Sequence, residues 1–240
     1  MSAGVDVLRA AILSDDAEPR LEVRREAVAP PTARWSASEF EREQLRALVR
    51  RVFFPGWPRP AKQVVFAGIE DGEDMAGTCL QVAQTLAAEV SATVALVPAT
   101  AEPGGEQSPL EWKNEVTGPQ SSLRMISRRL SEHVYEVPAQ VLAGQDGGAC
   151  PAARLRDRIH QLRHDFEYCV LYSPPLGRSN QAALLGQLTD GVVLVLQAHQ
   201  TRRAAASKAQ EVLRDANAKL IGVVLKGRRF PIPEGLYRRL

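Results

Sequence analysis

Short apolar runs alternate with longer amphipathic stretches along most of this chain. The runs contain few polar positions, which is typical of strands buried on both faces of a parallel sheet. They lie at residues 64–67, 93–97, 169–172, 192–196 and 221–225. Because the segments between most of them are long enough for helices, the pattern predicts one doubly wound α/β domain in which these strands are parallel.

The stretches between the runs show the 3.6-residue spacing of amphipathic helices. We expect helices at residues 38–50, 75–89, 122–133, 151–163, 180–188 and 201–216, and a short strand within 134–142. Prolines and glycines predict a linker at 29–32 and a surface excursion at 101–121. The chain is therefore expected to divide into a lead or linker at 1–36 and an α/β domain at 37–240 with a basic C-terminal tail.

Composition narrows the function classes. The chain has 240 residues, is 45% hydrophobic and carries a formal net charge of +2, which gives no overall attraction to nucleic acid or acidic lipid. Its cysteines lack metal-ligand spacing, and Cys79 and Cys169 lie in apolar surroundings, as expected of a reduced cytoplasmic protein. The first residues do not resemble a signal peptide, and no run approaches the roughly 20 apolar residues that span a bilayer. We expect no metal site, and membrane contact only through a partner.

The segment 68–74 connects a strand to a helix and has the outline of a phosphate-binding loop. Such a loop presents backbone N–H groups to phosphate, with a Lys for the β- and γ-phosphates and a Ser or Thr for Mg²⁺. Here no Lys occurs between Lys62 and Lys113. The turn carries four carboxylates instead, at Glu70, Asp71, Glu73 and Asp74. Because carboxylates repel phosphate, the sequence predicts a nucleotide site that has been lost.

Several fragments, taken in order, resemble the bacterial tyrosine kinases of capsule and exopolysaccharide synthesis. Those kinases are P-loop ATPases related to the plasmid-partitioning and division-site ATPases. The fragments are the Glu/Arg-rich helix at 39–50, Gly72-Glu73, the helical segment 80–83, the turn Ser173-Pro174-Pro175, and the strands at 189–195 and 221–225. The resemblance covers about residues 39–225 and implies a P-loop NTPase-like, three-layer αβα fold with a mostly parallel sheet.

The departures from this family are concentrated in the nucleotide loop. In the family's register, Asp74 replaces the last Gly of the loop and Met75 replaces the catalytic Lys. Ala76 and Gly77 replace the Ser/Thr positions. The positions of this degenerate loop are Gly68, Gly72, Glu73, Asp74, Met75, Ala76 and Gly77.

The acidic residues that hold the family's metal ion are also replaced. Pro98 and Thr100 stand at the Asp-x-Asp motif after the second strand, and Tyr172 stands where an Asp begins the Asp-Ser-Pro-Pro turn. Lys226 follows the last strand, where such ATPases place an Asn against adenine. Read this way, the sequence predicts no catalytic residue and no bound ATP or Mg²⁺ in this chain.

Two segments are candidates for partner binding: the charged helix at 38–50 with the aromatic residue beyond it, and the tail at 228–240. The candidate residues are Glu39, Arg42, Arg46, Arg50, Trp57, Phe230, Tyr237 and Arg238. Charges at i,i+3 and i,i+4 spacing are equally typical of a solvated helix face, and a basic tail is often solvated too. In the family, a Glu-x-x-Arg-x-x-Arg pattern here serves subunit assembly. Leu45 stands at its second Arg, so an oligomer is left open as an alternative.

The function expected from these observations is non-catalytic. The resemblance implies a pseudo-ATPase or pseudo-kinase that regulates or scaffolds capsule or exopolysaccharide synthesis and export, in the cytoplasm or peripheral to the inner membrane. Its partners would be a chain-length or co-polymerase membrane protein or an active homologous kinase, with no nucleic acid. Two alternatives stay open. One is an active ATPase or protein tyrosine kinase with an unorthodox loop, which would need ATP and Mg²⁺. The other is a partitioning- or division-site-type positioning protein.

Overall fold

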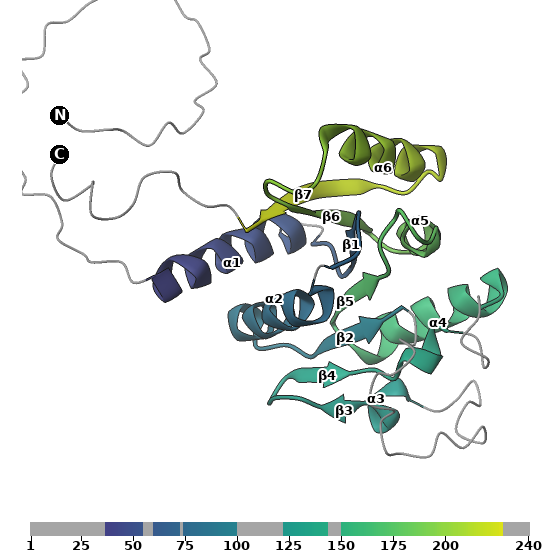
Figure 1. Cartoon of the computed structure of the whole chain (residues 1–240). Helices are drawn as coiled ribbons and strands as arrows, with labels where there is room; N and C mark the ends of the chain where they lie inside the picture. Colours follow the sequence, from purple (N-terminus) through teal and green to yellow (C-terminus); the bar gives the residue numbers. More distant parts are fainter. Residues whose placement is uncertain (1–36, 55–59, 73, 100–121, 144–149, 228–240) are drawn as a thin grey trace, which may run out of the picture. The chain divides into compact units, whose positions relative to one another are not determined.

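The fold is a twisted sheet covered by helices, described by a computed structural model over residues 37–54, 60–72, 74–99, 122–143 and 150–227. Within these residues, seven strands form one sheet in the order β3-β4-β2-β5-β1-β6-β7 (Figure 1). The strands are β1 (Gln63–Gly68), β2 (Val94–Pro98), β3 (Arg128–Arg129), β4 (Val134–Glu136), β5 (Tyr168–Ser173), β6 (Gly191–Gln197) and β7 (Leu220–Lys226). All neighbouring strands are parallel except β3 and β4. The predicted mostly parallel sheet is confirmed.

Helices cover both faces of the sheet, which gives three layers (Figure 1). On one face lie α1 (Ala37–Phe53) and α2 (Met75–Val90). The other face is covered by α4 (Ala152–Asp165), α5 (Gln181–Leu188) and α6 (Arg203–Asp215), together with the short helices α3 (Leu123–Ile126) and η2 (Ala139–Val141). Five of the six expected helices are therefore present with small shifts of their ends.

The central strand β1 shows why the apolar runs are nearly continuous. Val64 and Phe66 contribute to the core under α1 and α2, whereas Val65 and Ala67 contribute to the core under α4, α5 and α6. All four side chains are 0% exposed. Successive side chains of a strand point to opposite faces, so a strand with helices on both sides needs apolar residues at every position.

The expected helix at 122–133 is wrong. Only α3 is helical, and the chain then extends into β3, which pairs antiparallel with β4. Ser127 ends α3 with an extended backbone, and its hydroxyl donates to the Leu123 carbonyl oxygen at 2.7 Å. Arg128 then pairs with Glu136 of β4 at 2.8 Å. This cross-strand pairing is a long-range contact that overrides the local helical spacing.

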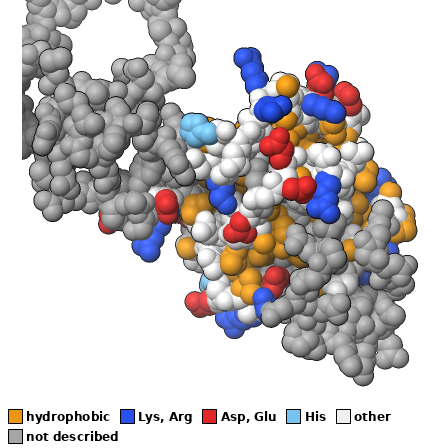
Figure 2. Space-filling view, viewed as in Figure 1, with side chains coloured by type: hydrophobic (Ala, Val, Ile, Leu, Met, Phe, Trp, Pro, Cys, Tyr) orange, Lys and Arg blue, Asp and Glu red, His pale blue; other side chains and the backbone are white. Residues whose placement is uncertain are grey.

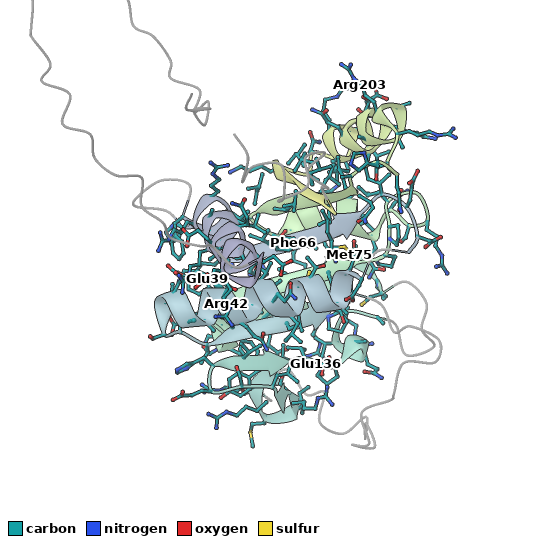
Figure 3. All side chains as sticks on the ribbon, turned by 60° about the vertical axis from the view of Figure 1, so that its left-hand side comes forward. Glu39, Arg42, Phe66, Met75, Glu136 and Arg203 are labelled. Atoms are coloured by element: carbon teal, nitrogen blue, oxygen red, sulfur yellow. The ribbon has the colours of Figure 1, made fainter. Side chains whose placement is uncertain are left out.

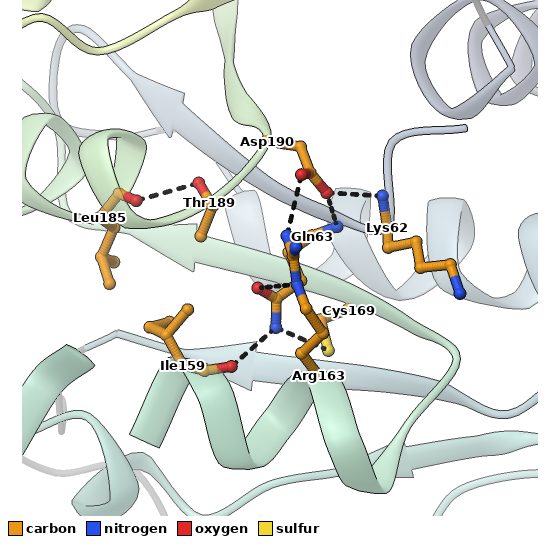
Figure 4. A network of polar contacts seen from close by, with 8 residues as sticks. All are labelled: Lys62, Gln63, Ile159, Arg163, Cys169, Leu185, Thr189 and Asp190. Atoms are coloured by element: carbon orange, nitrogen blue, oxygen red, sulfur yellow. Dashed lines mark hydrogen bonds and ion pairs between the residues drawn. The ribbon is translucent and has the colours of Figure 1, made fainter. Parts of the chain in front are cut away.

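A polar network ties the amino-terminal edge of the sheet together (Figure 4). The Asp190 carboxylate, before β6, accepts from the backbone N–H groups of Lys62 at 2.7 Å and Gln63 at 2.8 Å. Arg163 of α4 donates to Asp190 at 2.8 Å and to the Gln63 side-chain oxygen at 3.2 Å. Gln63 is 1% exposed and donates to the Ile159 carbonyl oxygen at 3.0 Å. The network holds the start of β1 to α4 and to the residue before β6.

Some sequence expectations fall on residues that the structure does not describe. The lead at 1–36, the excursion at 101–121 and the tail from residue 228 lie outside the described residues. Among the helices that are described, none is long and apolar enough to cross a membrane.

Candidate functional site

The loop after β1 lies at the carboxyl edge of the parallel sheet, where open α/β sheets bind their ligands. β1 is flanked by β5 and β6 near the middle of the sheet. The same edge receives the ends of β2, β5 and β7, and with them Pro98, Tyr172 and Lys226. The topology therefore brings the altered loop close to the ends of the strands that would complete a nucleotide site.

The Asp74 carboxylate caps the amino-terminal end of α2. Its Oδ1 accepts a hydrogen bond from the Gly77 backbone N–H at 2.8 Å, and its backbone carbonyl oxygen accepts from the Thr78 hydroxyl at 2.6 Å. Free N–H groups at a helix N-terminus are what a phosphate would bind. Here a carboxylate of the chain takes one of these donors as an N-cap, so an incoming phosphate would have to displace it.

Gly77 is the partner that allows this cap. A Cβ placed at Gly77 would collide with the Asp74 carboxylate. In the register of the resembled kinases this position carries Ser or Thr, and such a side chain would push the carboxylate away from the helix. Gly72 provides the turn just before, with a φ of +99° that glycine adopts without strain. Both glycines are thus compatible with the acidic cap seen here.

Met75 occupies the position where a catalytic Lys is expected. It is 8% exposed and lies in the core between α2 and the sheet, in the same apolar cluster as Phe66 and Cys79 (Figure 3). A thioether in a core supplies no cation for a phosphate. Ala76, which follows, is exposed and carries no hydroxyl for a metal ion. Glu73 lies outside the described residues.

Two of the positions that the resemblance assigns to metal ligands, Pro98 and Tyr172, lie side by side and carry no carboxylate. Pro98 pairs with Tyr172 across β2 and β5, and Tyr172 also faces Phe66 of β1. The next residue, Ala99, donates its N–H to the Tyr172 carbonyl oxygen at 2.8 Å. Thr100 lies outside the described residues. In the part of the chain that the structure describes, no group of three or more His, Cys, Asp or Glu residues could hold a metal ion.

A turn after β5 packs against the loop after β1. The N–H of Leu176 donates to the Gly68 carbonyl oxygen at 3.0 Å, and the N–H of Gly177 donates to the Ile69 carbonyl oxygen at 3.1 Å. The two segments enclose an open hollow of about 250 Å³, lined by Ile69, Glu70, Asp71, Pro175, Gly177 and Arg178. Two of these lining residues, Arg178 and Asp71, pair at 3.3 Å. The Asp71 carboxylate of the loop therefore already forms an ion pair within the chain.

Lys226 is a site residue whose contacts the sequence did not predict. Its ammonium lies 2.7 Å from the Thr78 hydroxyl and 3.4 Å from the Asp74 carbonyl oxygen, at the first turn of α2. The resemblance placed Lys226 after the last strand, but β6 separates β7 from β1 in the sheet. The Lys226 ammonium contacts this turn because its side chain is long, and no spacing in the sequence predicts that contact.

Two buried thiols, Cys79 of α2 and Cys169 of β5, have raised pKa values. Burial raises the pKa of the Cys169 thiol to about 12, with the hydrogen bond from Gln63 opposing the shift. Burial also raises the pKa of the Cys79 thiol, far above its ordinary value, although Lys226 opposes it. Since the thiolate is the reactive form, burial works against nucleophilic reactivity at both thiols.

The predicted partner helix is α1, and part of its charge is used within the fold. Arg50 pairs with Glu89 of α2 at 3.0 Å, and Arg46 lies 3.7 Å from the same carboxylate. Glu39 and Arg42 lie on the exposed surface of α1 (Figure 3). On the face shown in Figure 2, side chains of both signs are interspersed. The other candidates lie outside the described residues: Trp57, Phe230, Tyr237 and Arg238.

Comparison with known proteins shows which sequences this chain is similar to. A scan against models of protein families finds no match. Over 67 residues the chain is 33% identical to tyrosine-protein kinase CpsD of Streptococcus agalactiae, which covers 28% of this chain and 29% of CpsD. The match thus spans less than a third of that relative's length.

Solved structures match over more of the chain. The kinase domain of VpsO aligns with a TM-score of 0.60 at 19% identity, covering 80% of this chain and 98% of that domain. A plasmid partition protein from Borrelia burgdorferi aligns with a TM-score of 0.54 at 14% identity, covering 75% of this chain and 86% of that protein. At such identities the likeness shows the fold alone. The chain resembles the bacterial tyrosine kinases, and its fold is P-loop NTPase-like, as the sequence fragments predicted.

Proposed function

We propose that this chain is a non-catalytic, P-loop-like protein that regulates or scaffolds capsule or exopolysaccharide synthesis and export. It would act at the cytoplasmic face of the inner membrane by binding a chain-length or co-polymerase protein or an active homologous kinase. It would use neither ATP nor a metal ion. The resemblance to tyrosine kinases supports a role in capsule or exopolysaccharide synthesis. The Asp74 cap at the N-terminus of α2 supports the loss of catalysis.

The observation that carries the proposal is the Asp74 cap. To bind at α2, a phosphate would have to break the hydrogen bond from Gly77 to Asp74, which as an N-cap is worth about 1 kcal/mol. It would then meet like charges, at about 1 to 4 kcal/mol for each pair some 4 Å apart near a surface. No Lys stands at Met75 to offset these costs, and the Lys226 ammonium at this turn is already bonded to Thr78 and to the Asp74 carbonyl oxygen. Because about 1.4 kcal/mol is a factor of ten, a micromolar affinity would fall to the millimolar range or beyond.

Phosphoryl transfer gives the first test. The purified chain should incorporate no radioactive phosphate from labelled ATP, on its own tyrosines or on an added tyrosine-containing copolymer. An active capsule tyrosine kinase run in parallel is the positive control. Incorporation of label by the native chain would contradict the proposal.

Partner binding gives the second test. The full chain should bind the purified cytoplasmic segment of a chain-length protein, or the active homologous kinase, in a direct assay such as biolayer interferometry. Arg42→Glu on α1 should weaken this binding, because Arg42 is exposed on the candidate surface. Arg203→Glu on α6 is the matched control, since it makes the same charge change on the other face of the sheet. Equal loss with both variants would place the interface elsewhere.

One observation favours a second candidate function. The Lys226 ammonium lies at the first turn of α2, where a relocated cation could meet a phosphate in an active ATPase or tyrosine kinase with an unorthodox loop. That reading requires ATP binding in the native chain and its loss with Lys226→Met. The fold likeness to plasmid partition proteins adds no comparable observation for a positioning role.

A further inference from the structure

Lys226 connects two parts of the fold that are far apart in the sequence. Its backbone carbonyl oxygen accepts from the Ala198 N–H at 2.8 Å, which holds the end of β7 against β6. Its ammonium contacts Thr78 and the Asp74 carbonyl oxygen across the sheet edge. One residue therefore joins the edge strand to the first turn of α2.

The charge of Lys226 is unusual at this place. The N-terminal end of a helix carries partial positive charge and disfavours a cation. The side chain nevertheless lies there because two oxygen acceptors face it, and because the Asp74 carboxylate caps the same turn. Lys226 and Asp74 also act with opposite signs on the pKa of the Cys79 thiol, in agreement with their closeness to this turn. A carboxylate and an ammonium of the chain thus both occupy the first turn of α2.

We propose that Lys226 is a latch, a permanent internal substitute for the nucleotide that holds the first turn of α2 and the end of β7 together. This inference rests on the proposed absence of nucleotide binding. β7 is the edge strand, and two of its apolar side chains are exposed, Val223 at 55% and Leu225 at 54%. The Lys226 contact is therefore an attachment of this strand to the fold beyond its pairing with β6. Loss of the ammonium should therefore loosen both ends of the latch at once.

Residue-resolved amide hydrogen exchange on the full chain tests the latch. Lys226→Met removes the ammonium at similar length, and Thr78→Val removes its closest acceptor. Both variants should speed exchange by at least about fivefold in the first turn of α2 and at the end of β7, and leave β1 and β5 unchanged. Lys226→Arg is the matched control, because it keeps a cationic donor and should preserve the slow exchange.

The outcomes separate the latch from the proposed function. Unchanged exchange in both variants, or an equal rise throughout the sheet, would overturn the latch. If in addition no variant binds ATP in calorimetry, the proposed function stands without it. If the native chain binds ATP and Lys226→Met abolishes that binding, Lys226 is a phosphate-binding cation, and both the latch and the proposed function are wrong.

Discussion

Asp190 should be among the most costly charged residues to remove from this fold. Its carboxylate accepts hydrogen bonds from two backbone N–H groups and from Arg163 (Figure 4). Asp190→Ala leaves the N–H of the buried residue Gln63 without this acceptor, and an unsatisfied buried donor costs about 1 to 3 kcal/mol. The Asp190 side chain is 30% exposed and that of Arg163 is 46% exposed, so the ion pair itself adds only about 0.5 to 1 kcal/mol.

The expected loss is therefore about 1.5 to 4 kcal/mol in the free energy of unfolding, measured by urea denaturation followed by circular dichroism. For a domain of this size it corresponds to a fall in Tm of about 3–16 °C. Asp215→Ala is the matched control, because Asp215 pairs with Arg214 at 3.6 Å while both side chains are 75% exposed. That change should stay within about 0.5 kcal/mol. If Asp190→Ala destabilises no more than Asp215→Ala, the assigned role of the network is incorrect.

Three further predictions concern the core and its charges. Phe53→Ala removes a fully buried ring that meets Tyr168 edge to face, and should cost about 3 to 5 kcal/mol in denaturant unfolding; a loss below about 1 kcal/mol would refute the packing. Glu89→Gln removes the charge that Arg46 and Arg50 share, and should cost no more than about 1 kcal/mol, less at high salt. Burial raises the pKa of the Cys169 thiol from 9.0 to about 12. The contribution of the neutral thiol to the free energy of unfolding is therefore complete below pH 9. It is lost toward pH 12, because the unfolded chain releases this proton first. Stability should therefore fall more steeply with alkaline pH in the native chain than in Cys169→Ala, and equal slopes would contradict this.

The sheet could be predicted from the sequence because its pattern is local. A strand such as β1, buried on both faces, needs apolar residues throughout, and that requirement is visible in residues 64–67 alone. The parallel arrangement followed from helix-length connections. The failure at 122–133 has the opposite origin, since β3 exists through its pairing with β4 and not through its own residues.

The candidate site was predictable only in part. The loss of Lys at Met75 and of the acidic positions can be read directly from the register of the resembled kinases. The sequence indicated only that carboxylates in this loop would repel phosphate. The hydrogen bond from Gly77 to the Asp74 carboxylate, and the close approach that leaves a Cβ at Gly77 no room unless that carboxylate moves, require coordinates. The contact between Lys226 and Thr78 depends on the spatial order of strands and on a long side chain, so no sequence pattern reveals it.

Calorimetric titration of ATP with Mg²⁺ into the full native chain tests the central claim most directly. Loss of the phosphate-pairing cation, together with the Asp74 carboxylate at the end of α2, predicts no heat of binding up to about 1 mM nucleotide, an affinity weaker than about −4 kcal/mol. Hydrogen-exchange rates in residues 74–79 should also be the same with and without nucleotide. A micromolar Kd for ATP, with slower exchange in that turn, would contradict the account and show a working nucleotide site.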